Sequence, residues 1–321
     1  MKETVLGSHL RKVPSIAVGC MRLSEKSKDE MNHFIHSALE QGAYFFDHAD
    51  IYGSGMSETV FGDAFASDPS LHREDVLIQS KCGIRQGCYD LSKEHILESV
   101  DGILKRLQTD YIDFYLLHGV DADGFETVKR LGAYDFIRQK QAEGKVRHVG
   151  ISFHDTPEVL EKILDTYAFD FVQIQLNYLD WTMQNAKRQY ELLEERGIPC
   201  VVMEPVRGGA LASLDKDAAA VLKQARPQDS VASWAMRFVA SLPGVLTILS
   251  GMTTMDQLQD NLRTLSGFSP LSDADRDTLE TAIGIFRKNG IIPSFSGPTP
   301  ATSPCCPQAA STPFPSKTTT P

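Results

Sequence analysis

The sequence predicts a single (β/α)8 barrel, and three observations support this fold class. Short apolar segments alternate with segments of helical periodicity along most of the 321 residues. Eight such apolar segments occur, and they are continuously apolar rather than alternating, as expected for parallel strands buried on both faces. The chain is also long enough, because about 250 residues suffice for such a barrel.

The expected strands come at regular intervals, and each is followed by a helical pattern. In chain order they are Ser15–Val18, Ala43–Phe46, Val76–Ser80, Ile112–Leu117, Arg147–Ile151, Phe171–Gln175, Pro199–Met203 and Val245–Leu249. The helical segments place apolar residues at i, i+3, i+4 and i+7. Residues that typically begin helices precede three of them, namely Ser92, Thr156 and Thr253.

A doubly wound dinucleotide-binding sheet is the alternative fold. Its G-x-G-x-x-G fingerprint is absent, since Gly19 after the first strand is followed by Cys20. We therefore predict a barrel domain over residues 1–290, with a small hairpin around residues 4–10 and one further helix over 272–286. Residues 291–321 are rich in Pro, Ser and Thr, which predicts a largely disordered tail.

Composition and charge exclude several function classes. A formal net charge of −10 without any Lys/Arg cluster indicates that nucleic acid is not the partner. No apolar run reaches transmembrane length and the N-terminus lacks a signal-peptide pattern, so we expect a cytoplasmic protein that binds no membrane. The six scattered cysteines form no disulfide framework and are expected to be reduced. Oligomeric state stays open.

Four polar residues stand at or just beyond the ends of three expected strands. They are Asp47, Tyr52, Lys81 and His118. The carboxyl ends of barrel strands meet at one rim, so we expect these side chains to lie together. A phenol with an ordinary pKa of about 10 donates protons poorly at neutral pH, but a neighbouring ammonium held by a carboxylate lowers that pKa.

This chemistry assigns a role to each of the four. Tyr52 is the expected general acid, and Lys81 and Asp47 tune it. His118 can hydrogen-bond a substrate oxygen and help to orient it. The reaction that suits this set is proton transfer at a carbonyl or alcohol oxygen while another group moves a hydride. Because no side chain carries hydride, a nicotinamide cofactor is implied.

The motifs around these residues resemble the aldo-keto reductase signature. They are Phe46–Gly53 with Glu58 and Phe61–Gly62, Ser80–Gly83, Leu116–His118 and Gly144–Ser152. The resemblance runs from the first strand to Leu265. It implies NADPH-dependent reduction of aldehydes and ketones on a (β/α)8 barrel, with Asp47, Tyr52, Lys81 and His118 as the catalytic tetrad.

The same resemblance implies a set of cofactor contacts. Ser152 and Gln173 would hold the nicotinamide carboxamide, and Met203 would pack on the ring in place of the usual aromatic residue. The other implied contacts are Glu204, Val206, Arg207 and Gly208 after the seventh strand, and Gly251, Met252, Gln257, Asp260 and Asn261 at the adenosine end. Gly251 and Gln257 replace cations that usually bind the 2′-phosphate, so NADP(H) is favoured and NAD(H) stays possible.

The second half of the chain resembles a bacterial branch of this family, many of whose members end in an iron–sulfur segment. That segment begins Ile-Pro-Cys-x-x-Cys, whereas here Ile292–Pro293 is followed by Ser294. Cys305–Cys306 cannot supply the four thiolates that a cubane requires. We predict no iron–sulfur cluster and no metal.

Two other functions stay open. A metal-dependent hydrolase barrel would use Asp47, His48, Asp50 and His118 as ligands, although the first strand offers no His-x-His pair. A nucleotide-binding regulatory subunit with weak activity would keep the barrel and the cofactor site.

Overall fold

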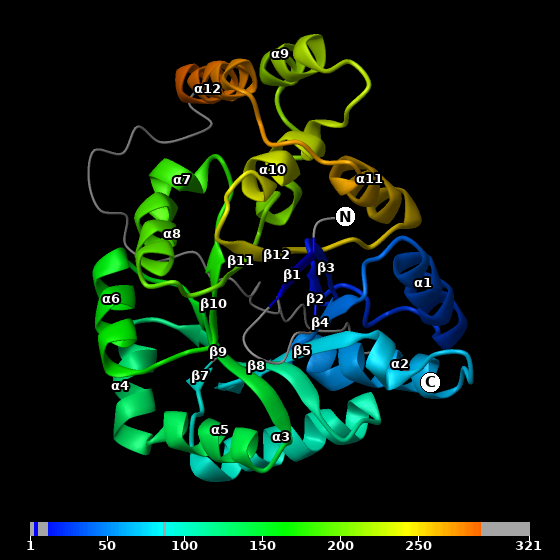
Figure 1. Cartoon of the computed structure of the whole chain (residues 1–321), viewed down its shortest axis with the longest axis vertical. Helices are drawn as coiled ribbons and strands as arrows, with labels where there is room; N and C mark the ends of the chain where they lie inside the picture. Colours follow the sequence, from blue (N-terminus) through cyan, green and yellow to red (C-terminus); the bar gives the residue numbers. More distant parts are fainter. Residues whose placement is uncertain (1–2, 6–11, 86–87, 290–321) are drawn as a thin grey trace, which may run out of the picture.

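Eight parallel strands close into a barrel in the computed structural model, which describes residues 3–5, 12–85 and 88–289 (Figure 1). The strands are β3 (Ile16–Gly19), β4 (Phe45–Asp47), β5 (Leu77–Cys82), β8 (Ile112–Val120), β9 (Val146–Phe153), β10 (Phe171–Gln175), β11 (Cys200–Met203) and β12 (Val245–Ser250). Strands that are consecutive in this series are neighbours in the barrel, and β12 pairs with β3. The predicted (β/α)8 fold is confirmed.

Helices surround the barrel. They are α1 (Lys28–Glu40), α2 (Met56–Ala66), α3 (Lys93–Leu107), α4 (Ala122–Leu131), α5 (Ala133–Ala142), α6 (Pro157–Thr166), α7 (Asp180–Met183), α8 (Ala186–Glu195), α9 (Lys216–Ala225), α10 (Val231–Ala240), α11 (Met255–Leu265) and α12 (Asp273–Lys288). The further helix predicted over 272–286 is α12, which packs against α9. Among the described residues, no helix is long and apolar enough to cross a membrane.

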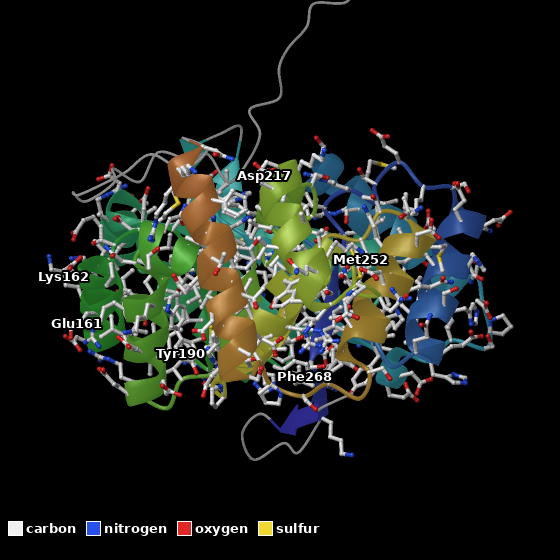
Figure 2. All side chains as sticks on the ribbon, turned by 90° about the horizontal axis from the view of Figure 1, so that it is seen from above. Glu161, Lys162, Tyr190, Asp217, Met252 and Phe268 are labelled. Atoms are coloured by element: carbon white, nitrogen blue, oxygen red, sulfur yellow. The ribbon has the colours of Figure 1, made fainter. Side chains whose placement is uncertain are left out.

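The two ends of the barrel differ. An antiparallel pair of strands, β1 (Glu3–Val5) and β2 (Lys12–Pro14), lies at the amino-terminal end, so the hairpin is wider than the predicted residues 4–10. Figure 2 shows β1 at the lower end and Asp217, in the first turn of α9, at the opposite end. A second short pair, β6 (Ile84–Arg85) and β7 (Cys88–Tyr89), follows β5. The predicted tail, residues 291–321, lies outside the described residues.

The predicted helix starts are confirmed at Ser92 and Thr156, which are the N-caps of α3 and α6, whereas the start of α11 lies one residue later than predicted. The Ser92 side chain accepts a hydrogen bond from the amide of His95. The N-cap of α11 is Thr254, where we predicted Thr253, and Gln257 completes a capping box with it. Thr156 precedes α6 without making a side-chain capping bond.

Side chains along each strand point alternately towards the helices and into the barrel lumen, so the apolar side chains form two layers. One set of positions packs under the helices, and the other fills the barrel lumen with side chains such as Phe45, Leu77, Phe114 and Phe171. Towards the carboxyl ends of the strands the lumen set becomes polar. The fold therefore places polar side chains at one rim, next to the apolar side chains that fill the rest of the lumen.

On its helix side, strand β5 contacts an ion pair whose carboxylate is buried and whose guanidinium is partly exposed. Glu58 on α2 is completely buried, and its carboxylate accepts hydrogen bonds from Ser80 Oγ at 2.5 Å and Arg106 Nε at 2.6 Å. Ser80 thus faces the helices, so Gln79 and Lys81 on either side of it face the lumen.

Gly62 on α2 packs directly against the backbone of α3. A Cβ atom there would lie 2.1 Å from the carbonyl oxygen of Arg106. We expect Gly62→Ala to lower the free energy of unfolding by about 1–3 kcal/mol, because the helices must move apart. Gly284→Ala is the matched control, since Gly284 lies exposed in α12 with open space around it. That change should raise stability by roughly 0.5–1 kcal/mol. Urea unfolding measures both, and equal stability of the Gly62→Ala and wild-type proteins would refute the close approach.

Candidate active site

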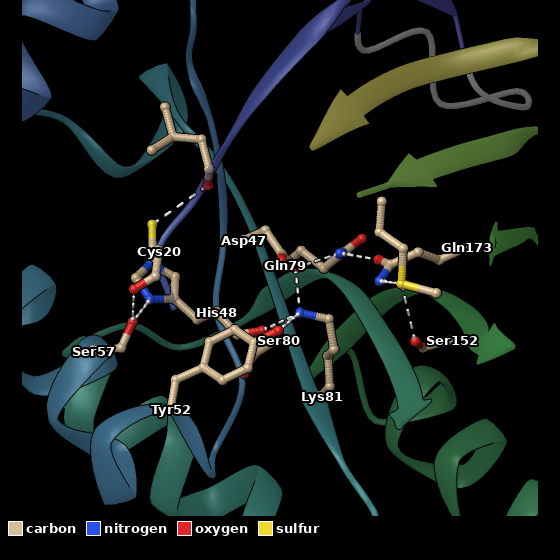
Figure 3. Close-up of polar contacts among 12 residues, drawn as sticks. Cys20, Asp47, His48, Tyr52, Ser57, Gln79, Ser80, Lys81, Ser152 and Gln173 are labelled. Atoms are coloured by element: carbon tan, nitrogen blue, oxygen red, sulfur yellow. Dashed lines mark hydrogen bonds and ion pairs between the residues drawn. The ribbon is translucent and has the colours of Figure 1, made fainter. Parts of the chain in front are cut away.

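The ammonium group of Lys81 is the centre of the polar rim. Its side chain is completely buried, and Nζ donates to Asp47 Oδ1 at 2.6 Å, to the His48 carbonyl oxygen at 2.7 Å and to Tyr52 Oη at 3.2 Å (Figure 3). An ammonium has three protons, so these three acceptors match its capacity. The structure therefore brings Asp47, Tyr52 and Lys81 together at the ends of β4 and β5, as predicted.

Asp47 carries the charge that compensates Lys81. It ends β4 and is almost fully buried. Burial raises its pKa, while the neighbouring Lys81 and the amide of Gln79 act in the opposite direction. The same oxygen, Oδ1, accepts from both Lys81 and Gln79.

Tyr52 reaches Lys81 because a tight turn follows β4. It begins the 3-10 turn η2 (Tyr52–Gly55), in which Gly53 has a φ of 58°. A Cβ atom on Gly53 would also lie 2.7 Å from Cβ of Ser24, so both conformation and space require glycine here. The turn leaves the Tyr52 ring half-buried, with Nζ of Lys81 4.8 Å from its centroid.

His118 completes the set at the end of β8. Its ring meets the Tyr52 ring edge-on, with centroids 6.0 Å apart. Burial lowers the pKa of His118 well below the usual histidine value, and the charge of Lys81 acts in the same direction. Its Nδ1 is buried without a hydrogen-bond partner among the described residues. The ring is therefore neutral at neutral pH.

A second imidazole, His154, lies beside this group. Its Nε2 is 3.3 Å from Ser152 Oγ, just beyond the end of β9. Burial lowers the pKa of His154 to about 4. His154 stands close to the position where the family resemblance expects an asparagine.

The four side chains proposed as hydrolase metal ligands do not converge. Asp47 is bound to Lys81, the His48 ring binds Ser57 Oγ at 2.9 Å, and Asp50 accepts from Ser99 at 2.8 Å. Among the described residues, no group of three His, Cys, Asp or Glu side chains is arranged to hold a metal ion. His48 serves the site through its backbone carbonyl instead.

The residues expected around the nicotinamide also meet. Gln173 on β10 donates to Met203 Sδ at 3.2 Å, and Ser152 Oγ on β9 lies 3.8 Å from the same sulfur. A thioether is a weak acceptor, so the donor of Gln173 is poorly satisfied by it. These three side chains lie together, and the donors of Gln173 and Ser152 suit a carboxamide.

After β11 the backbone takes unusual conformations. Glu204 and Arg207 have φ values of 55° and 50°, and Gly208 has 62°. Arg207 Nε lies 3.4 Å from the buried carboxylate of Asp180, while Val206 is half-buried. The Arg207 side chain is thus held in place by β10–α7 rather than extended into solvent.

At the adenosine end, the predicted residues are engaged within the protein. Gln257 Oε1 accepts from the amide of Thr253, and Asn261 Nδ2 donates to Ser250 Oγ. Asp260 accepts from Ser230 and Arg263. Met252 is completely buried in the apolar layer under the helices, whereas Gly251 is exposed. The cofactor contacts of these residues stay predictions.

Comparison with known proteins agrees with this geometry. The family model described as "Aldo/keto reductase family" matches residues 15–283. The chain belongs to the aldo/keto reductase family. It is 27% identical over 292 residues to the uncharacterized oxidoreductase YqkF of Bacillus subtilis, covering 82% of this chain and 90% of that protein. It is 29% identical to the NADH-specific methylglyoxal reductase of Escherichia coli, covering 73% and 81% of the two chains.

A solved aldo-keto reductase is similar in structure as well. The holo form of the enzyme AKR11C1 from Bacillus halodurans matches with a TM-score of 0.74 and 27% identity, over 88% of this chain and 96% of that one. The expected family membership is therefore confirmed.

Two parts of this aldo/keto reductase site were missed by the sequence analysis. One is the His48 backbone carbonyl, for which a sequence holds no signal. The other is Gln79, which shares Asp47 with Lys81. Its signal was a glutamine within a buried strand, two positions before Lys81 and hence on the same face.

The neutral histidines of this aldo/keto reductase give a pH prediction. Burial lowers the pKa of His48 to about 3 and of His154 to about 4, whereas unfolded histidine titrates at about 6.5. Below that pH only the unfolded chain binds these protons, so stability should fall as the pH drops from about 6.5 towards 4. His154→Gln should flatten this slope, and the exposed-residue control His33→Gln should not. Urea unfolding across this range tests it, and a slope unchanged in His154→Gln would contradict the assigned shift.

Proposed function

We propose that this protein is an NAD(P)H-dependent oxidoreductase that reduces an aldehyde or ketone to an alcohol. The observation that carries the proposal is the contact of Lys81 with both Asp47 and Tyr52 Oη. A buried ammonium beside a phenol stabilises the phenolate that remains when Tyr52 gives up its proton. Such an arrangement serves proton donation to an oxygen that gains negative charge.

Tyr52 is the proposed general acid. Its oxygen accepts a hydrogen bond from Lys81, and a phenol can also donate its own proton to a substrate oxygen. As the carbonyl oxygen takes this proton, the O–H bond of Tyr52 breaks and its electron pair stays on the phenolate. Lys81, fixed by Asp47, stabilises that charge without moving.

His118 is proposed to orient the carbonyl. The neutral ring has one N–H, and placing it on the buried Nδ1 would leave a donor without an acceptor among the described residues. The favoured tautomer therefore carries its proton on Nε2, which can donate to the substrate oxygen together with Tyr52.

The nicotinamide cofactor supplies the hydride when it is bound. Gln173 and Ser152 are proposed to hold its carboxamide and Met203 to pack on its ring, because their polar atoms face one another at the rim. Glu204, Val206, Arg207 and Gly208 are proposed for the pyrophosphate segment. Gly251, Met252, Gln257, Asp260 and Asn261 are proposed for the adenosine end, with Met252 contributing through packing behind it.

Removal of the Tyr52 hydroxyl tests the central role. We expect Tyr52→Phe to lower kcat for a small aldehyde by about 10²–10⁴-fold, because general acid catalysis is lost. The nucleotide dissociation constant should stay the same. Tyr44→Phe is the matched control, since the Tyr44 hydroxyl donates to the Lys12 carbonyl at the other end of the barrel.

Steady-state oxidation of NADPH with methylglyoxal provides the measurement, since a relative bears that substrate in its name. Equal rates for the wild-type protein and Tyr52→Phe would refute the assignment of Tyr52 as the general acid. A wild-type protein that binds nucleotide but reduces no carbonyl would favour a regulatory subunit.

NADP(H) is the proposed cofactor, although the position of Gly251 and Gln257 offers no cation for the 2′-phosphate. We expect NADPH to bind more tightly than NADH by less than about tenfold. Gln257→Arg should increase that preference by introducing a charge-assisted contact. Fluorescence titration with both cofactors measures it. Tighter binding of NADH, the cofactor in the name of the E. coli relative, would reverse the assignment.

A further inference from the structure

Gln79 is a buried polar residue in the lumen that the proposed chemistry does not use. It lies on β5, two positions before Lys81, and none of its surface is exposed. Lumen positions of these strands nearer the amino-terminal end are filled by apolar side chains. Burying an amide at this depth costs free energy unless its hydrogen bonds are made, so Gln79 requires hydrogen-bond partners within the lumen.

The Gln79 amide connects two strands that are not neighbours. Its Nε2 donates to Asp47 Oδ1 and, at 2.8 Å, to Gln173 Oε1 (Figure 3). Asp47 is on the adjacent β4, but Gln173 is on β10, and β8 and β9 lie between β5 and β10 in the barrel. The bond between Gln79 and Gln173 therefore crosses the lumen. It joins the proton-transfer residues to the residues proposed to hold the nicotinamide.

The chemistry of the partners fixes the orientation of both amides. A carboxylate only accepts hydrogen bonds, so Asp47 requires the NH2 group of Gln79 to face it. The second N–H of the same group meets Gln173, which must present its carbonyl oxygen there. The NH2 group of Gln173 is then directed the other way, towards Met203 Sδ at 3.2 Å.

The carbonyl oxygen of Gln79 does not constrain the orientation of the side chain. Oε1 is buried and has no hydrogen-bond partner among the described residues. The orientation of Gln79 is thus set by what its NH2 group binds and not by its oxygen.

We propose that Gln79 is a positioning residue that transmits the orientation of Asp47 to Gln173, so that the Gln173 donor faces the carboxamide of the nicotinamide. This inference rests on the proposed function. It predicts that a residue without contact to the cofactor controls cofactor affinity, through Gln173. It also explains how one carboxylate can align the proton-donating and hydride-supplying halves of the site.

A double-mutant cycle on cofactor binding tests this role. We expect Gln79→Leu and Gln173→Leu each to raise the NADPH dissociation constant by roughly three- to tenfold, the value of one hydrogen bond. The double variant should bind no more weakly than Gln173→Leu alone, because Gln79 acts through Gln173. Gln79→Met, which keeps the length of the side chain, replaces Gln79→Leu if that variant does not fold.

The control separates positioning from general stability. Gln189 on α8 is also buried and donates to the carbonyl oxygens of Asp155 and Gln184. Gln189→Leu should lower the midpoint of urea unfolding as Gln79→Leu does, but leave the NADPH dissociation constant unchanged. A purely structural role for Gln79 would make the two variants behave alike.

The outcomes distinguish this inference from the function on which it rests. Wild-type protein that binds neither NADPH nor NADH would overturn the proposed function and this inference together. Wild-type binding with unchanged affinity in Gln79→Leu would overturn the inference alone. Losses in the double variant that equal the product of the two single losses would do the same, since independent contacts would then act at the two positions.

Discussion

Lys81 places a positive charge in the barrel lumen with none of its side chain exposed, and the rest of the site depends on how that charge is accommodated. Moving an ammonium out of water costs several kcal/mol, which attraction repays only when partners are well placed. Three acceptors surround Nζ, and each comes from a segment that the fold brings to the carboxyl rim. The buried charge therefore dictates where Asp47, the His48 backbone and Tyr52 lie.

The surrounding fold keeps those partners in place. Ser80, between Gln79 and Lys81, is bound to Glu58 on the helix side, and Glu58 is bound to Arg106 on α3. Gly62 allows α2 and α3 to approach closely enough for this pair to form. The Phe46–Gly62 motif thus specifies helix packing behind β5 as well as chemistry in front of it. Loss of the Glu58 contacts, or of the close helix packing at Gly62, would let Lys81 shift relative to Tyr52.

Much of this arrangement was predictable because it depends on local patterns. Buried parallel strands are continuously apolar, and a polar residue that ends such a strand lies at the rim, so the sequence predicts the place of Asp47, Lys81 and His118. The contact between Gln79 and Gln173 was not predictable, since it depends on how far apart β5 and β10 stand across the lumen. The burial of Met252 depends on which way one residue turns after β12 ends. The N-cap at Thr254 rather than Thr253 is a comparable one-residue difference.

The electrostatics of the rim follow from the same buried pair. His118, His154 and His48 all lie within reach of the Lys81 charge, and burial together with that charge keeps each imidazole neutral. Lys81 and Asp47 compensate each other, so the lumen end carries little net charge at neutral pH. A neutral imidazole can donate to a carbonyl without competing as an acid, since its N–H is far less acidic than that of imidazolium. Among Tyr52, His118 and Lys81, the phenol is then the group whose proton loss is stabilised by an adjacent cation, and this asymmetry selects it as the acid.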